Sequence, residues 1–167
     1  LAQVHLAVLD DGFVEASVLT ESGADDAEVG EALLKKIVVP VASFRGDGAY
    51  DTRAYYTALG RAGTPDIDIV IPPQRKASPS QSVVGTWRMR NEAIDRIDQV
   101  GRRQWRKESG AHQQARAENG MFRFKQIVGD RLRARTFERQ KREAMIGVTI
   151  INRMTTLGMP ESRAIRV

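Results

Sequence analysis

Apolar and polar side chains alternate over the first twenty residues, on both sides of Asp11 and Gly12. A period of two is typical of strands that bury one face, and an Asp-Gly pair between two such runs predicts a tight hairpin. We therefore interpret Asp10 and Asp11 as turn residues rather than as catalytic acids.

A helical pattern follows over residues 26–38, where Val29, Leu33 and Leu34 fall on one face. Acids occupy its first turn and lysines its end, which favours a helix because of the helix dipole, and Pro40 is expected to end it.

Two further extended segments flank a second helical pattern. Residues 41–50 predict a short strand that runs into Asp47, which has a glycine on each side. Residues 51–63 predict a helix with Asp51 as its N-cap and Gly63 near its end. Residues 66–73 predict a buried strand closed by prolines.

The second half of the chain predicts helices. Residues 74–86 are rich in Ser, Pro and charge and are expected to form an exposed loop, and residues 87–167 a basic helical part. Gly110 is expected to precede a helix that holds Glu118, and a last helix is predicted over residues 137–157. Its expected buried stripe consists of Ala144, Met145, Val148, Ile151 and Met154.

This order of elements predicts an α/β fold with a mixed sheet and flanking helices. With 167 residues and 41% hydrophobic composition, the chain is expected to form one domain. Ligands in such folds collect beyond the carboxyl ends of strands, where Asp47 is expected to lie. The alternative is an ordinary turn aspartate.

Charge is distributed unevenly along the chain. Residues 1–74 carry 5 Lys and Arg against 12 Asp and Glu, a net charge of −7; residues 75–167 carry 21 against 9, a net charge of +12. Of the 26 basic residues 20 are arginine, which suits bidentate phosphate contacts, so the second half is expected to bind a nucleic-acid backbone. A solvated arginine-rich surface is the alternative.

The chain contains no cysteine, which excludes disulfides, thiolate zinc sites and cysteine nucleophiles. Its longest apolar runs, such as IVVPVASF, fall short of the ~20 residues that span a bilayer. We therefore expect a soluble, cytoplasmic protein.

Glu118 stands among basic residues in the stretch ARAENGMFRFKQIVGDRLRAR. It is either a helix-stabilising partner for the arginines or a metal ligand placed where a polyanion lies. On a helix, Lys125 lies two turns further along the same face, about 10.5 Å away along the axis.

Several separated motifs, in the same order, resemble the C-terminal part of the bacterial insertion-sequence transposases of the DDE type. They are HLAVLDDG, GDGAYDTRAYY, VIPPQRKA, RNEAIDRIDQVGRRQWRKESG and the stretch from ENGMFRFKQIVGD to GMPES. The resemblance spans nearly all of the chain. It implies a ribonuclease H-like fold, in which three acids hold two Mg²⁺ (or Mn²⁺) ions that cut transposon ends and join them to target DNA.

The resemblance also implies roles for individual residues. Asp47 matches the second catalytic acid, and Tyr50 the tyrosine of its motif. Glu118 matches the third acid and Lys125 the lysine that follows it. Asp47 and Glu118 are then expected to be catalytic residues that bind the metal ions.

The sequence departs from the family pattern in two respects. Ala111 and Gln114 stand where the pattern has tyrosine and arginine, so the DNA-end contacts of those residues do not carry over. In the family the first acid lies on a strand before the one predicted here at residues 4–8. We therefore expect a fragment that lacks the first catalytic strand and, with two acids for two ions, does not cut DNA by itself.

Double-stranded DNA, both transposon ends and target, is the expected partner, and a homo-oligomer is expected on DNA. The candidate DNA contacts are Tyr50, Arg123, Lys125, Arg131, Arg133 and Arg135. Two alternatives remain open: a DNA-binding remnant or regulator without catalysis, and a ribonuclease H-like nuclease.

Overall fold

The computed structural model describes residues 2–81, 84–111 and 115–158, and the chain divides into two compact units. The parallel-strand unit comprises mainly Thr20–Ala115, and the hairpin unit comprises Val4–Leu19 and Arg116–Val167. The chain length predicts a single domain, whereas the structure shows two units. Each unit is described by itself.

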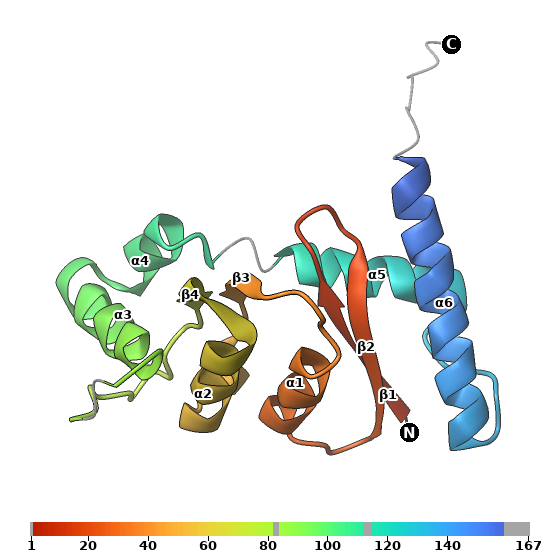
Figure 1. The fold of residues 1–167 in the computed structure, drawn as a ribbon, viewed down its shortest axis with the longest axis horizontal. Coiled ribbons are helices and arrows are strands. Elements are labelled where there is room, and N and C mark those ends of the chain that lie inside the picture. The colour runs from red at the N-terminus through yellow and green to blue at the C-terminus, as the bar shows by residue number, and fades with distance from the viewer. Residues whose placement is uncertain (1, 82–83, 112–114, 159–167) are drawn as a thin grey trace, which may run out of the picture. The chain divides into compact units, whose positions relative to one another are not determined.

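The parallel-strand unit is built around a βαβ crossover. Strands β3 (Val41–Arg45) and β4 (Gly63–Val70) pair in parallel, with Arg45 opposite Val70, and helix α2 (Arg53–Ala62) connects them (Figure 1). Helix α1 (Asp26–Leu34) packs against α2. It ends at Leu34, four residues before the predicted end.

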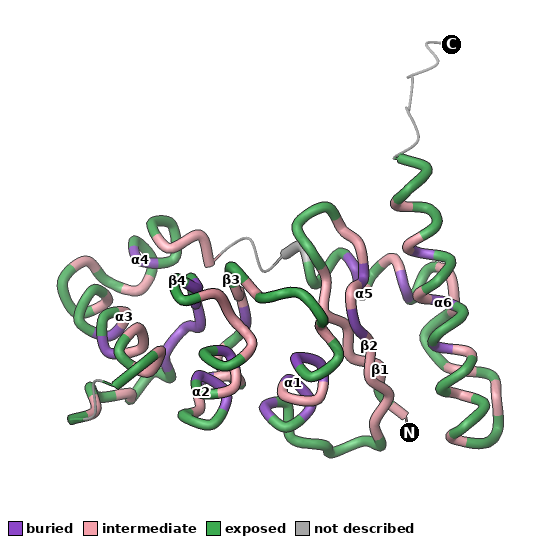
Figure 2. Tube along the Cα trace, viewed as in Figure 1, coloured by how far each residue is buried: buried purple, intermediate pink, exposed green. Residues whose placement is uncertain are grey.

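The core of this unit lies between the two helices and the parallel strands. Buried positions gather on α1, α2 and β4 (Figure 2). The cluster consists of Ala27, Leu34, Tyr55, Tyr56, Leu59, Ile67, Ile69 and Ile71. The predicted strand over residues 66–73 is confirmed in part, because β4 begins at Gly63 and ends at Val70, before the prolines.

Two helices follow the loop after β4. Helix α3 (Trp87–Val100) and helix α4 (Arg102–Glu108) are separated by Gly101, whose φ of +81° favours glycine. The start of the predicted basic helical part, residues 87–108, is therefore helical with a break at this glycine. Trp105, on α4, is buried.

The Asp51 side chain is fully buried in an ion pair and does not cap α2. Arg90 donates from Nε to Asp51 Oδ1 at 2.6 Å, and the backbone N–H of Gln74 donates to Asp51 Oδ2 at 3.0 Å. The N-cap is Thr52, whose Oγ1 accepts from Tyr55 N at 3.2 Å. The predicted cap at Asp51 is thus wrong, because a guanidinium partner distant in sequence binds this carboxylate.

Helix α3 also holds the loop that precedes it. Arg90 donates to the carbonyl of Ser78 at 3.1 Å, and its guanidinium stacks over the ring of Trp87 at 4.7 Å. The Asn91 amide exchanges two hydrogen bonds with the backbone of Ser80. The described residues of this loop, 74–81 and 84–86, form no helix or strand, and Ser78 and Ser80 are tied to α3.

The hairpin unit contains β1 (Ala2–Val8), β2 (Val14–Glu21), α5 (Ala115–Val128) and α6 (Phe137–Leu157). Asp11 accepts from Phe13 N at 2.9 Å, which confirms its predicted turn role. The Asn152 amide binds both backbone groups of Val14, at 2.7 and 2.9 Å, and so fastens α6 to β2. The buried cluster consists of Val14, Phe124, Ala144 and Ile151.

The buried stripe of α6 is narrower than predicted. Ala144 and Ile151 are buried, whereas Met145 and Met154 are 63% and 49% exposed. A side chain at Gly147 would collide with α5, so the two helices approach closely there. Because α6 contacts α5 only along the narrow face that contains Gly147, Met145 and Met154 lie outside the contact. Their predicted burial is therefore wrong.

The predicted α/β class is confirmed. In the described residues the strands form two two-stranded sheets, β1–β2 and β3–β4. No helix in the described part of the chain is long and apolar enough to cross a membrane.

The buried ion pair makes a testable contribution to stability. Replacing Arg90 with Met leaves the Asp51 carboxylate buried without its counter-charge, so we expect the free energy of unfolding of the parallel-strand unit to fall by about 3–5 kcal/mol. Urea unfolding followed by circular dichroism measures this loss.

Arg88 provides the control, because it is exposed and pairs with Glu92 one turn along α3. Arg88→Met should cost less than about 1 kcal/mol. Equal losses for the two variants would contradict the role given to the Asp51–Arg90 pair.

Candidate active site and nucleic-acid interface

Asp47 lies at the carboxyl edge of the parallel strand pair. It follows β3 by two residues, and Pro72 follows β4 by two residues at the same edge. Gly46 N donates to the carbonyl of Val70 at 3.2 Å and joins the two strand ends. The sequence prediction that Asp47 lies just beyond a strand end is confirmed.

The Asp47 carboxylate is exposed and only half used. It begins the short 3₁₀ helix η1 (Gly48–Tyr50), where Oδ1 accepts from Ala49 N at 2.9 Å. Its other oxygen forms no hydrogen bond with a described residue. A Cβ on Gly48 would lie 3.2 Å from the Pro72 carbonyl oxygen, so glycine lets the two turns approach.

The ring of Tyr50 packs against the rings of Phe44 and Tyr55. Its centroid lies 5.9 Å from that of Phe44 and 4.8 Å from that of Tyr55. Burial, followed by the negative charges of Asp47 and Asp26, raises the pKa of Tyr50 to about 12. The hydroxyl therefore stays protonated at neutral pH. Its DNA contact stays a prediction.

A hollow of about 620 Å³ opens beside Asp47. One wall is the turn from Pro72 to Arg75 and the other is α4. Four arginines line it, namely Arg75, Arg102, Arg103 and Arg106. We call this hollow the arginine groove. The sequence analysis did not single out these residues, although a helix places 102, 103 and 106 within one turn.

Only one of the four arginines is used by the fold. Arg102 donates to the carbonyls of Pro73 at 2.7 Å and Gln74 at 3.4 Å, and so fixes α4 to the turn. Within the described residues, Arg75, Arg103 and Arg106 form no ion pair or side-chain hydrogen bond. The groove therefore presents three free guanidinium groups next to one carboxylate.

Carboxylates such as that of Asp47 suit hard divalent cations, but the described residues of neither unit provide a complete set of metal ligands. No group of three or more His, Asp or Glu side chains that could hold a metal occurs in the ranges that the structure describes. One exposed carboxylate oxygen, such as that of Asp47, gives Mg²⁺ only one of its six ligands, and waters, substrate phosphates or another acid must supply the rest.

Glu118 lies in the first turn of α5, and Lys125 lies in the last turn. Both side chains are exposed, and neither forms an ion pair with a described residue. Phe122 lies between them and is 60% exposed. The predicted face with an acid and a lysine two turns apart is thus present, and it carries an aromatic ring that the sequence analysis did not consider.

Arg123, in contrast, is used inside the hairpin unit. Its guanidinium donates to the carbonyl of Gly12 at 3.2 Å, to that of Ile151 at 3.3 Å and to Thr155 Oγ1 at 2.9 Å. These contacts tie α5 to the hairpin turn and to α6. A DNA contact by Arg123 stays a prediction.

The three remaining candidate arginines alternate with packed residues in the loop between α5 and α6. Arg131, Arg133 and Arg135 are exposed, while Leu132 and Ala134 are partly buried. This alternation directs all three guanidinium groups away from the core.

Glu143 on α6 holds the backbone of this loop. Its carboxylate accepts from Arg133 N at 2.9 Å and Ala134 N at 2.8 Å. These two backbone hydrogen bonds lower the pKa of Glu143. The arginines are therefore presented by a fixed backbone.

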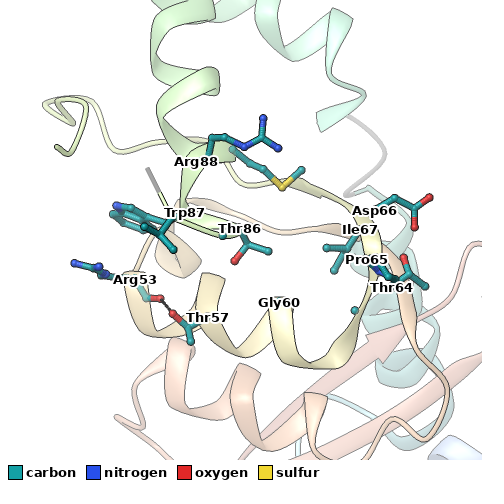
Figure 3. Close-up of a pocket in the computed structure, with 14 residues that line it drawn as sticks. Arg53, Thr57, Gly60, Thr64, Pro65, Asp66, Ile67, Thr86, Trp87 and Arg88 are labelled. Carbon is teal, nitrogen blue, oxygen red and sulfur yellow. Dashed lines mark hydrogen bonds between the residues drawn. The ribbon is translucent and has the colours of Figure 1, made fainter. Parts of the chain in front are cut away.

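A second hollow, of about 880 Å³, lies between α2, the start of β4 and the start of α3 (Figure 3). Its charged lining residues are Asp66, Arg53 and Arg88, with Trp87 and several threonines around them. It contains a single carboxylate and none of the candidate residues. We therefore place the candidate site at Asp47, although this second hollow is larger.

Of the two positions that depart from the expected pattern, Ala111 is partly buried, and Gln114 lies outside the described residues.

Comparison with known proteins identifies the family. The sequence model of the transposase DDE domain family matches residues 2–153, which include all of the candidate residues. No solved structure matches the chain. Since the match covers most of the chain and both compact units, the protein belongs to the transposase DDE domain family.

Proposed function

We propose that the chain forms part of the catalytic domain of a transposase, which cuts transposon ends and joins them to target DNA. The observation that carries this proposal is the family match over residues 2–153. The exposed, half-used carboxylate of Asp47 at a strand end supports it. A ribonuclease H-like arrangement of the complete domain is part of the same proposal.

Asp47 and Glu118 are the proposed metal ligands. Both are exposed carboxylates, and hard oxygen donors of this kind suit Mg²⁺ and Mn²⁺. When bound, such ions activate the attacking oxygen and stabilise the leaving oxygen of a phosphodiester. The chain's own contribution is to hold each carboxylate on a defined backbone, one at a strand end and one in the first turn of α5.

DNA is the proposed substrate, bound mainly through phosphate contacts. Lys125 and the arginines at 131, 133 and 135 are exposed on the hairpin unit and are directed to solvent. The net charge of +12 over residues 75–167 supplies the attraction. Assembly into a homo-oligomer on DNA belongs to this proposal.

A regulator that occupies transposon ends without cutting them is the second candidate. The departures at Ala111 and Gln114 favour it, because two DNA-end contacts of the family pattern are replaced there. Mg²⁺-dependent nicking of a transposon-end duplex by the whole transposase, and its loss in Asp47→Ala, separates the two candidates.

The metal-ligand roles predict reduced cation affinity. Asp47→Asn and Glu118→Gln should each weaken Mn²⁺ binding by about 10-fold or more, since each removes a charged oxygen ligand. Isothermal titration calorimetry measures the affinity. Asp66→Asn is the matched control, because Asp66 is also exposed but lies near the amino end of β4. Equal affinities in all three variants would rule out the assignment.

The loop arginines predict salt-sensitive DNA binding. Each phosphate contact adds roughly −0.9 to the slope of log affinity against log salt, so the triple variant Arg131→Gln, Arg133→Gln, Arg135→Gln should flatten the slope by up to about 2.7. Glu118→Gln should strengthen binding slightly. Fluorescence anisotropy of a labelled duplex measures both.

A control variant removes three positively charged side chains at a different place on the protein. Lys35, Lys36 and Arg61 are exposed near the amino edge of the parallel strands, and their triple Gln variant should keep the parental slope. Salt-insensitive binding by the parent, or equal slopes for parent and loop variant, would refute the phosphate contacts.

The hydrogen bonds of Glu143 predict that the backbone of the loop that carries Arg131, Arg133 and Arg135 becomes less stable at low pH. Because its folded pKa lies below the ordinary value of 4.5, the ionised carboxylate stabilises the loop above that pH, and the stabilisation is lost as pH falls through the lowered pKa. In NMR titrations, the amide signals of Arg133 and Ala134 should move together with a midpoint below 4.5. Glu143→Gln should abolish the movement; a midpoint above the ordinary value, or movement that persists in Glu143→Gln, would contradict the arrangement.

A further inference from the structure

We propose that the arginine groove binds the backbone phosphates of a DNA strand that passes Asp47. Its ligand is thus a phosphodiester chain, and its binding residues are Arg75, Arg103 and Arg106. The identification of the polyanion as DNA rests on the proposed function. The groove itself is carried by separate observations on the parallel-strand unit.

The first observation is uncompensated charge in a concave site. Four arginines and one carboxylate line the hollow, and three of the arginines have no partner among the described residues. The acid of α4 is not available to them, because Glu108 accepts from Arg96 Nε at 2.9 Å and from Gln104 Nε2 at 3.0 Å. Like charges held together without counter-charges repel, and a bound polyanion removes that repulsion.

The second observation is that the fold holds both walls of the groove in place. Arg102 ties α4 to the carbonyls of Pro73 and Gln74. The buried Asp51 carboxylate accepts from Gln74 N at 3.0 Å and so fixes the same turn from the other side. Trp105, on α4, is buried. The free guanidinium groups therefore extend from a backbone that needs little reorganisation on binding.

The third observation is the spacing of the free arginines. Arg103 and Arg106 are three residues apart on α4, so they lie on one face with about 5–6 Å between their Cβ atoms. Arg75 faces the same hollow from the opposite wall. Guanidinium groups bind phosphate oxygens in bidentate fashion, which favours a phosphodiester backbone over a single small anion in a hollow of about 620 Å³.

The position of the groove gives it a role in the proposed reaction. Asp47 lines the same hollow, and its second carboxylate oxygen is free. A strand held by the groove arginines therefore passes next to a proposed metal ligand. The groove contributes binding and orientation of the strand.

The test compares two triple variants of the full chain that remove equal charge. Arg75→Gln, Arg103→Gln, Arg106→Gln changes the groove, and Lys35→Gln, Lys36→Gln, Arg61→Gln changes the opposite edge of the same strands. Anisotropy of a labelled 20-base-pair duplex is measured over a range of salt concentrations. The groove variant should lower the slope of log affinity against log salt by up to about 2.7, and the edge variant should leave it unchanged.

A second measurement locates the DNA directly. The chain has no cysteine, so Lys76→Cys next to the groove carries a single fluorophore, and Lys36→Cys carries it at the opposite edge. Duplex should change the emission of the first and not of the second. Circular dichroism melting checks folding, and the single variants Arg103→Gln and Arg106→Gln should each lower the slope by about 0.9 if the triple variant is unstable.

The outcomes separate the groove from the proposed function. If the groove variant binds DNA like the parent, the groove does not bind DNA. That result does not affect the roles proposed for Asp47 and Glu118 as metal ligands or for Arg131, Arg133 and Arg135 as DNA contacts. Equal losses in the groove and edge variants also overturn it, because they show only the effect of net charge. Selective loss in the groove variant supports the groove even if Asp47→Asn keeps full Mn²⁺ affinity, a result that counts against the metal role alone.

Discussion

The buried ion pair between Asp51 and Arg90 is the constraint on which the parallel-strand unit depends. The Asp51 side chain is 0% exposed and that of Arg90 is 11% exposed, so both charges are removed from water and require partners. Asp51 uses both carboxylate oxygens, one for Arg90 and one for the Gln74 amide. Arg90 adds the Ser78 carbonyl and the Trp87 ring. One pair thus joins the end of η1, the turn after β4 and the start of α3.

The site is a consequence of this arrangement. Two acids four residues apart have opposite environments: Asp51 is buried and fully bonded, whereas Asp47 is exposed with one oxygen free. Asp51 fixes the backbone, and we propose that Asp47 binds a ligand. The same division occurs among the arginines, since Arg102 bonds to the turn while Arg75, Arg103 and Arg106 remain free. The side chains that bond within the fold hold the walls, and we propose that the exposed ones bind the ligands.

Features set by local sequence were predictable. The hairpin at Asp11, the helix end at Gly63 and the bounds of the last helix follow from turn residues, capping and periodicity, and the structure agrees. The places of Asp47 beyond a strand and of Glu118 on a helix were also predicted. Their functional roles came from the family resemblance, which the match over residues 2–153 supports.

Features set by contacts distant in sequence were not predictable. Asp51 was assigned to a cap because its partner, Arg90, lies 39 residues away. The predicted stripe of α6 included Met145 and Met154, because periodicity does not reveal how closely α5 approaches at Gly147. The arginine groove was missed for the same reason, since Arg75 and α4 meet only in the folded unit.

We propose that the fold leaves one oxygen of the Asp47 carboxylate free for a divalent cation beside a phosphate-binding groove. Paramagnetic broadening of backbone amide signals by Mn²⁺ in the isotope-labelled chain tests it most directly. We expect selective broadening of the amide signals of Gly46, Asp47 and Gly48 at low Mn²⁺ concentration, and retention of those signals in Asp47→Asn. Broadening centred on other acids, such as Asp25 and Asp26, with the signals around Asp47 unaffected, would contradict it.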